Sequence, residues 1–186
     1  MADDRTPGGR KPGLAGARLT TATARMVRLP FAEVTSVMIR QLADYWNELR
    51  GARPCPLKKD FDPSRVITLL PYLIVAEYHF NPLRIRYRLV GTEQVRQVGE
   101  DYTGKWLHEM LWDPRYIEVW LAAVREMIET RQPVFGRDSL LWTDGKIKEY
   151  EWAIFPMTTD GVSVTHSIGI EDFSTVERLR GLLAPD

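Results

Sequence analysis

The sequence has little of the two residues that most often build disulfides and metal sites, with one cysteine and three histidines in 186 residues. One cysteine excludes an intramolecular disulfide and a cysteine metal cluster. The histidines lack the spacing of metal ligands, so no metal site is expected. Cys55 lies between Pro54 and Pro56. We interpret it as a free thiol in a loop, and a reactive thiol is the alternative.

Long apolar runs and an excess of charge of either sign are also missing. No run approaches the roughly 20 apolar residues of a membrane span, and the N-terminus has no apolar signal-peptide core, which predicts a cytoplasmic protein. The 25 basic and 25 acidic side chains give a net charge of zero, which argues against a dedicated nucleic-acid binder. Residues 1–30 nevertheless hold six basic and two acidic side chains, a local charge of +4.

Motifs of the common enzyme classes are absent from the sequence. We find no nucleophile elbow, P-loop or dinucleotide fingerprint. Glu149 and Glu151 alternate with aromatic residues, so they point to one side of a predicted strand. They could serve acid–base catalysis, but an outward-facing charged side is the simpler interpretation. We predict that the protein is not an enzyme. The alternative is a small-molecule hydrolase or isomerase on a cone-shaped α+β sheet, which a buried carboxylate in a pocket would favour.

What the sequence does contain is a chain of four predicted parts. Residues 1–33 are rich in Gly, Ala, Thr, Arg and Pro and are predicted to be a flexible basic tail. Residues 34–65 hold an N-terminal cap helix, 34–50, and a linker broken by prolines. Residues 66–173 form an α+β domain, and residues 174–186 include a short C-terminal helix.

The helix predicted over 34–50 has one apolar stripe at helical spacing. This stripe must cover either the sheet of its own domain or a helix of a partner. We therefore expect self-association, as a homodimer, through this stripe. The residues of this candidate interface are Leu42, Tyr45, Trp46 and Leu49.

Two strands are predicted over 72–80 and 83–90. In the second strand, alternation places Leu83, Ile85, Tyr87 and Leu89 on one face, which indicates a sheet with one wet side. Three arginines occupy the other face. They are most simply a solvated surface, and a phosphate or acidic-partner site is the alternative. These residues are Arg84, Arg86 and Arg88.

Helices and three further strands follow. A short helix over 93–98 and another ending at Met110 precede a long helix that begins at Asp113-Pro114. The strands are predicted over 134–143, 146–159 and 162–172, joined by Asp144-Gly145 and Asp160-Gly161. Asp-Gly pairs favour type I′ hairpin turns, with positive φ at both central positions.

Residues 87–92 form a "Y-R-x-x-G-T" segment, and residues 99–104 form a "G-x-D-x-T-G" segment. Both segments resemble those of the PAS domain, and in particular of a bacterial single-domain PAS subfamily of the alphaproteobacterial type. Asp172-Phe173-Ser174 resembles the "D-I-T" exit of the last PAS strand, and Tyr45-Trp46 and Leu70-Pro71 also suit the subfamily. The resemblance implies an α+β fold with a five-stranded antiparallel sheet, helices on one face and an N-terminal helical cap.

The resemblance also implies a sensory or interaction module. A small molecule would lie between the sheet and the helices, and a signalling protein would receive the signal, because the chain stops soon after Asp172 with no output domain expected. Two hypotheses follow. A ligand sensor predicts a cavity of several hundred Å³, whereas an interaction adaptor predicts a filled core.

Cofactors known from PAS proteins fit the sequence poorly. Cys55 precedes the core, which disfavours a flavin–thiol adduct and a thioester-linked chromophore. The long helix lacks the histidine that haem-binding relatives often use, and an axial role for His108 is the remaining option. An organic ligand or no ligand is left. Candidate ligand-binding residues, each of which could equally fill or satisfy the core, are Tyr87, Trp106, Trp120, Trp152 and His166.

Overall fold

The computed structural model describes residues 26–110, 114–141 and 147–174. Its centre is a six-stranded antiparallel sheet with the spatial order β1-β4-β5-β6-β2-β3. The strands are β1 (Val27–Leu29), β2 (Leu73–His79), β3 (Arg84–Val90), β4 (Val134–Leu141), β5 (Ile147–Thr158) and β6 (Val164–Asp172). The α-helices are α1 (Val37–Arg50), α2 (Thr92–Val98) and α3 (Pro114–Thr130), and short 3₁₀ turns include η1 (Phe31–Glu33) and η5 (Leu107–Glu109).

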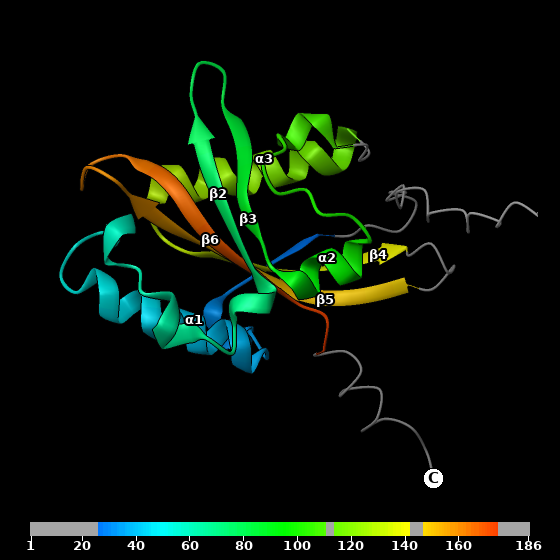
Figure 1. Ribbon diagram of the computed structural model, residues 1–186, viewed down its shortest axis with the longest axis horizontal. Helices are drawn as coiled ribbons and strands as arrows, with labels where there is room; N and C mark the ends of the chain where they lie inside the picture. Colours follow the sequence, from blue (N-terminus) through cyan, green and yellow to red (C-terminus); the bar gives the residue numbers. More distant parts are fainter. Residues whose placement is uncertain (1–25, 111–113, 142–146, 175–186) are drawn as a thin grey trace, which may run out of the picture.

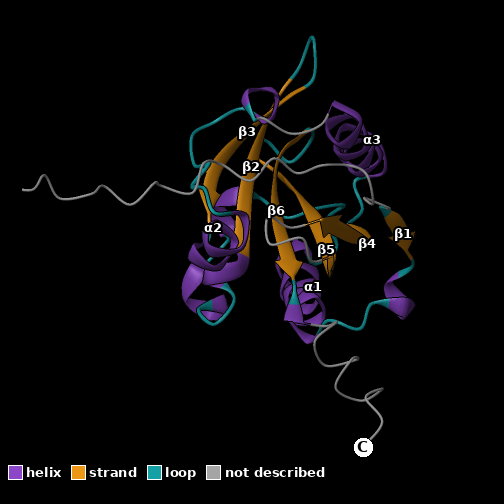
Figure 2. Ribbon diagram, turned by 90° about the vertical axis from the view of Figure 1, so that its right-hand side faces the viewer, coloured by secondary structure: helices purple, strands orange, loops and turns teal. Residues whose placement is uncertain are grey.

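The two long helices cover opposite faces of the sheet (Figures 1 and 2). Side chains on neighbouring positions of β5 point to opposite faces. Trp152 packs against Trp120 of α3, with ring centroids 4.8 Å apart. Phe155 instead packs against Trp46 of α1, at 6.2 Å. Each face of the sheet is therefore partly covered by a helix. The predicted α+β architecture is confirmed, and β1 adds a sixth strand to the five that were predicted.

β1 lies within the segment predicted to be a flexible tail. Val27 pairs with Arg137 and Leu29 with Phe135 of β4, and η1 follows directly. Composition missed this strand because three residues are too few to register in a segment rich in glycine and arginine. The tail prediction for residues 1–25 lies outside the described residues.

A β-bulge changes the faces predicted for β3. Ala76 pairs with Tyr87 but Val75 pairs with Leu89, so Arg88 is the extra residue. Strict alternation would have placed Leu89 beside Tyr87. The bulge moves Leu89 to the opposite, outer face, where 46% of its surface is exposed.

The second predicted hairpin turn is longer than expected. β5 ends at Thr158 and β6 begins at Val164, so residues 159–163 connect them. Gly161 has a φ of 81°, whereas Asp160 does not have positive φ. The Asp160 carboxylate instead accepts hydrogen bonds from the backbone of Val162 and Ser163, at 2.8 and 2.9 Å. The type I′ prediction is therefore wrong here, and the turn predicted at Asp144-Gly145 lies outside the described residues.

Gly91, in the segment that resembles "Y-R-x-x-G-T", is enclosed by main-chain atoms. A Cβ atom there would lie 2.2 Å from the Pro71 carbonyl oxygen and 2.7 Å from that of Leu70. We expect Gly91→Ala to lower the free energy of unfolding by about 1–3 kcal/mol, because backbone atoms cannot move aside cheaply. Urea denaturation measures this loss. Gly169→Ala is the matched control, since the nearest atoms lie at 3.6 Å. Equal stability of the two variants would contradict the prediction.

Candidate functional site

A cavity lies between the sheet and α3. Its volume is about 50 Å³, which leaves room for on the order of four water molecules. It is smaller than the several hundred Å³ expected for a ligand sensor, yet the core is not completely filled. The lining residues come from β2, β3, β5, β6, α3 and the segment before η5, and most are aliphatic or aromatic.

Glu171 of β6 brings a carboxyl group to this cavity. It lies on the same face of the strand as Ser167 and Gly169, which also line the cavity. Within the described part of the chain, its side chain makes no hydrogen bond. Desolvation by burial, with a smaller contribution from Asp138, raises the pKa of Glu171 to about 8. The carboxyl group is therefore mainly protonated at neutral pH.

A second carboxyl group, that of Asp138, interacts electrostatically with Glu171 and belongs to a chain of hydrogen bonds. The Tyr150 hydroxyl donates to Asp138 Oδ2 at 3.2 Å, and the hydroxyls of Tyr116 and Tyr150 are 2.8 Å apart. Asp138 is 1% exposed. Burial raises its pKa to about 6, against the hydrogen bonds from Ser139 and Tyr150 that lower it.

Aromatic residues form much of the remaining wall. Tyr87 and Tyr102 pack edge to face with centroids 4.7 Å apart, and Trp120 closes the α3 side. Tyr78 also lines the cavity, but its hydroxyl lies 2.5 Å from Ser167 Oγ, so both groups already have a partner. Burial raises the pKa of each of these tyrosines, which keeps the phenols neutral.

Two of the five predicted ligand-binding residues, Tyr87 and Trp120, line the cavity, and three do not. Trp106 lies near the β2–β3 hairpin, with Arg84 4.7 Å from its ring and His79 at 4.9 Å. Trp152 is buried and packs against Trp120, and its indole nitrogen has no hydrogen-bond partner among the described residues.

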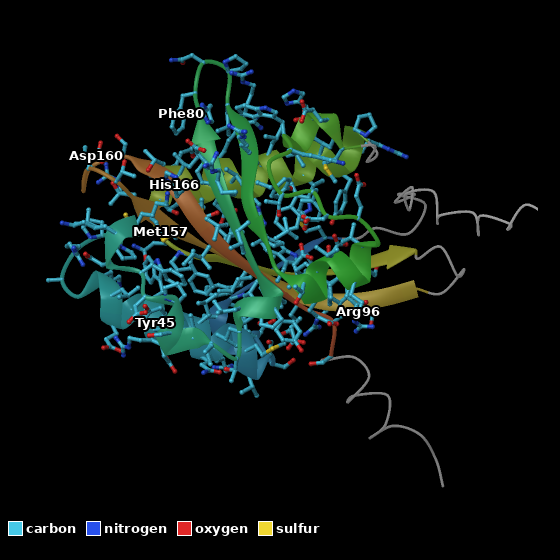
Figure 3. All side chains as sticks on the ribbon, viewed as in Figure 1. Tyr45, Phe80, Arg96, Met157, Asp160 and His166 are labelled. Atoms are coloured by element: carbon cyan, nitrogen blue, oxygen red, sulfur yellow. The ribbon has the colours of Figure 1, made fainter. Side chains whose placement is uncertain are left out.

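His166 lies on the other face of β6, towards α1. It pairs in register with Glu77 of β2 and Met157 of β5, near the Asp160 end of the sheet (Figure 3). Its Nδ1 is 3.0 Å from Thr165 Oγ1, and burial lowers its pKa. This placement separates His166 from the cavity by the thickness of the sheet.

The predicted interface stripe on α1 is mainly buried within the chain. Leu42, Tyr45 and Trp46 are at most 6% exposed, and Leu49 is partly buried. The Trp46 indole donates a hydrogen bond to the Pro156 carbonyl at 2.8 Å, and the Tyr45 hydroxyl donates to the Asp62 carbonyl at 3.0 Å. Because one chain already covers this stripe, the reason to expect a homodimer through it no longer holds.

Glu151, predicted to face outward, is instead buried and holds the start of α1. Its carboxylate accepts from the backbone N–H groups of Thr35 and Ser36, both at 2.8 Å, and from Arg137 at 2.8 Å. Burial by itself raises the pKa of Glu151, but these hydrogen bonds outweigh it and the pKa is lowered. Alternation on β5 predicts correctly that Glu149 and Glu151 share a face of the strand. It does not predict that the start of α1 covers Glu151.

Asp172 links the same helix to the end of β6. Ser36, the N-cap of α1, donates its hydroxyl to Asp172 Oδ2 at 2.6 Å. The other carboxylate oxygen accepts from the backbone and the hydroxyl of Ser174, at 2.8 and 2.6 Å. At the neighbouring residue, the Gln94 side chain of α2 donates a hydrogen bond to the backbone carbonyl oxygen of Glu171 at 2.9 Å. Consecutive residues of β6 thus connect the cavity with α1.

Sequence reasoning missed Glu171 and Asp138. The sequence holds a signal for Glu171, because it alternates in phase with Ser167 and Gly169, whereas the other phase of β6 contains the apolar Val164, Ile168 and Ile170. The in-phase residues are small or polar, a pattern that is equally typical of a solvent-exposed face. Here they border a cavity under α3.

The structure supplies no thiol or metal cluster for the cavity. Cys55, the only cysteine, is buried outside it, and desolvation raises the pKa of its thiol. The cavity therefore has no thiol for a covalent adduct. Across residues 26–110, 114–141 and 147–174, no group of three or more His, Cys, Asp or Glu side chains could hold a metal ion. Among the helices in these ranges, none is long and apolar enough to cross a membrane.

The chain is similar to a solved structure and to a family model. A solved structure described as an RNA-binding Light-Oxygen-Voltage receptor matches with 17% identity and a TM-score of 0.43, covering 87% of this chain and 44% of that one. The chain thus spans less than half of that receptor. None of the curated proteins compared with the chain matches it. The family model described as "PAS domain" matches residues 34–170, most of the sequence, and the chain therefore belongs to the PAS domain family.

Proposed function

We propose that this PAS module senses a small molecule bound in the cavity between the sheet and α3, and acts as a non-enzymatic regulator. The observation that supports this most directly is the Glu171 carboxyl group, which borders the cavity without a hydrogen bond from the described chain. A desolvated carboxyl group without a partner is costly. A ligand that hydrogen bonds to it would remove part of that cost.

The route for the signal in this proposal is the end of β6. A ligand that shifts Glu171 also moves the backbone of the next residue, and Asp172 holds the N-cap of α1 through Ser36. Asp172 also holds Ser174, the last described residue. Ligand binding would therefore bias the positions of α1 and of Ser174, where a signalling protein could read the change.

Native mass spectrometry of the protein purified from its own host tests the proposal. We expect an added mass that is lost on denaturation. Gly169 lines the cavity and a Cβ atom fits there without a clash, so Gly169→Ala should retain the added mass and the bulkier Gly169→Val should reduce or abolish it. Circular dichroism confirms that both variants fold. An added mass that persists at full occupancy in Gly169→Val would place the ligand elsewhere, and no added mass in the unmodified protein would favour the adaptor hypothesis.

A small-molecule enzyme is the second candidate, because Glu171 is a half-buried carboxyl group that borders the cavity. A carboxyl group with a pKa of about 8 can exchange a proton near neutral pH. Proton exchange into a bound carbonyl compound, followed as solvent deuterium uptake, distinguishes this candidate. Deuterium incorporation that disappears in Glu171→Gln would support the enzyme and overturn the non-enzymatic proposal.

A further inference from the structure

We propose that the cavity takes a small organic cation, an alkylammonium group that forms an ion pair with Glu171 and packs against Tyr87, Tyr102 and Trp120. This inference rests on the proposed function and names the chemical class of the ligand. It depends on the charge, the aromatic surface and the size of the cavity.

The charges around the cavity favour a cation. Glu171 is the only lining residue with a carboxyl group, and no lining residue is Lys, Arg or His. Asp138 lies close enough to raise the pKa of Glu171 electrostatically. An anionic ligand would add a further negative charge at this place, with no basic lining residue to offset it. An ammonium ion instead supplies the counter-charge that the described chain does not provide.

The aromatic surface favours the same ligand. Tyr87, Tyr102 and Trp120 line the cavity, and the faces of aromatic rings attract desolvated organic cations. The hydroxyls of Tyr78 and Ser167 pair with each other, which leaves the Glu171 carboxyl group as the lining polar group in need of a partner. A primary ammonium ion carries three N–H donors, so it can donate a hydrogen bond to this carboxylate.

The size of the cavity limits the cation to a few heavy atoms. A cavity volume of about 50 Å³ excludes bulky ligands unless side chains move. Propylammonium, 1-propanol and propionate are therefore suitable probes, because they match in size and differ in charge. A neutral ligand that accepts a hydrogen bond from protonated Glu171 is the competing outcome that these probes distinguish.

Binding of a cation is coupled to loss of a proton from Glu171. The groups that interact with Glu171 are Asp138 on β4, Tyr150 on β5, Tyr116 on α3, Tyr87 on β3 and Tyr102 before η5. The tyrosines stay neutral, whereas Asp138 ionises near pH 6 and Glu171 near pH 8. An alkylammonium ion keeps its proton through this range. Its affinity should therefore increase by up to about tenfold for each pH unit between pH 6 and pH 8.

Titrations followed by NMR of the Trp120 indole N–H signal test the inference at matched ionic strength. We expect a saturable shift with propylammonium, at least about tenfold tighter than with 1-propanol, and no shift with propionate. Glu171→Gln should reduce propylammonium binding to the level of 1-propanol. Glu77→Gln is the matched control, because Glu77 pairs in register with His166 on the face of the sheet away from the cavity. This variant should bind propylammonium like the unmodified protein.

Each alternative result has a defined meaning. Equal affinities for 1-propanol and propylammonium, or unchanged propylammonium binding in Glu171→Gln, would overturn the proposal that the ligand is a cation paired with Glu171. Either result would still show a ligand cavity and would leave the proposed function in place. No saturable shift with any of the three probes would overturn the inference, and the added-mass measurement would decide the proposed function separately. If Glu171→Gln does not fold, the pH dependence of propylammonium binding to the unmodified protein decides, since an affinity independent of pH from 6 to 8 overturns the ion pair.

Discussion

Trp46→Ala should lower the free energy of unfolding by about 3–5 kcal/mol, the usual cost of removing a large buried aromatic side chain. Trp46 is 3% exposed, packs against Phe155, and donates a hydrogen bond to the Pro156 carbonyl oxygen. The variant loses this packing and leaves a buried acceptor without its donor. Urea denaturation of the two proteins at equal concentration measures the difference.

Val37→Ala is the control for this prediction, because Val37 begins the same helix but is 64% exposed. It should change the free energy of unfolding by less than about 0.5 kcal/mol. Light scattering adds a readout of oligomeric state. If the unmodified protein is a dimer that Trp46→Ala dissociates without loss of monomer stability, the α1 stripe is intermolecular after all.

Glu171→Gln should raise the free energy of unfolding at alkaline pH by an amount on the order of 3 kcal/mol. Burial raises the pKa of Glu171 from 4.5 to about 8 in the folded protein, so the folded state holds a proton that the unfolded state releases. The stabilisation from this proton is complete below about pH 4.5 and is lost as the pH rises towards 8. Each unit of pKa difference corresponds to about 1.4 kcal/mol. Because Glu171 is partly accessible to solvent, the expected change in free energy is smaller than the whole pKa difference would give.

Chemical denaturation at a series of pH values between 5 and 9 checks this prediction. The stability curves of Glu171→Gln and the unmodified protein should converge near pH 5 and separate towards pH 9. Glu151 has the opposite sign, since its lowered pKa gives stability that is lost as the pH falls, and it acts equally in both proteins. Parallel curves over the whole range would show that Glu171 titrates normally.

The sequence by itself determined the order and type of nearly all elements and the family. Local periodicity predicts the helix at Pro114–Thr130 and the strands from Leu73 to Asp172, because the 3.6-residue and two-residue repeats depend only on neighbouring positions. The short motifs follow from local geometry too, as Gly91 shows, where main-chain atoms of Pro71 leave no space for a side chain.

Only the tertiary structure decided which faces are covered and what they enclose. Alternation shows that Glu151 and Glu171 lie on opposite faces of the sheet, but not that α1 buries one and that the other borders a cavity beneath α3. It also could not show that Trp46 is covered by its own chain. The physical reason is that burial, and with it the pKa of a carboxyl group, depends on contacts between residues far apart in sequence, such as Ser36 with Asp172 or Trp120 with Trp152.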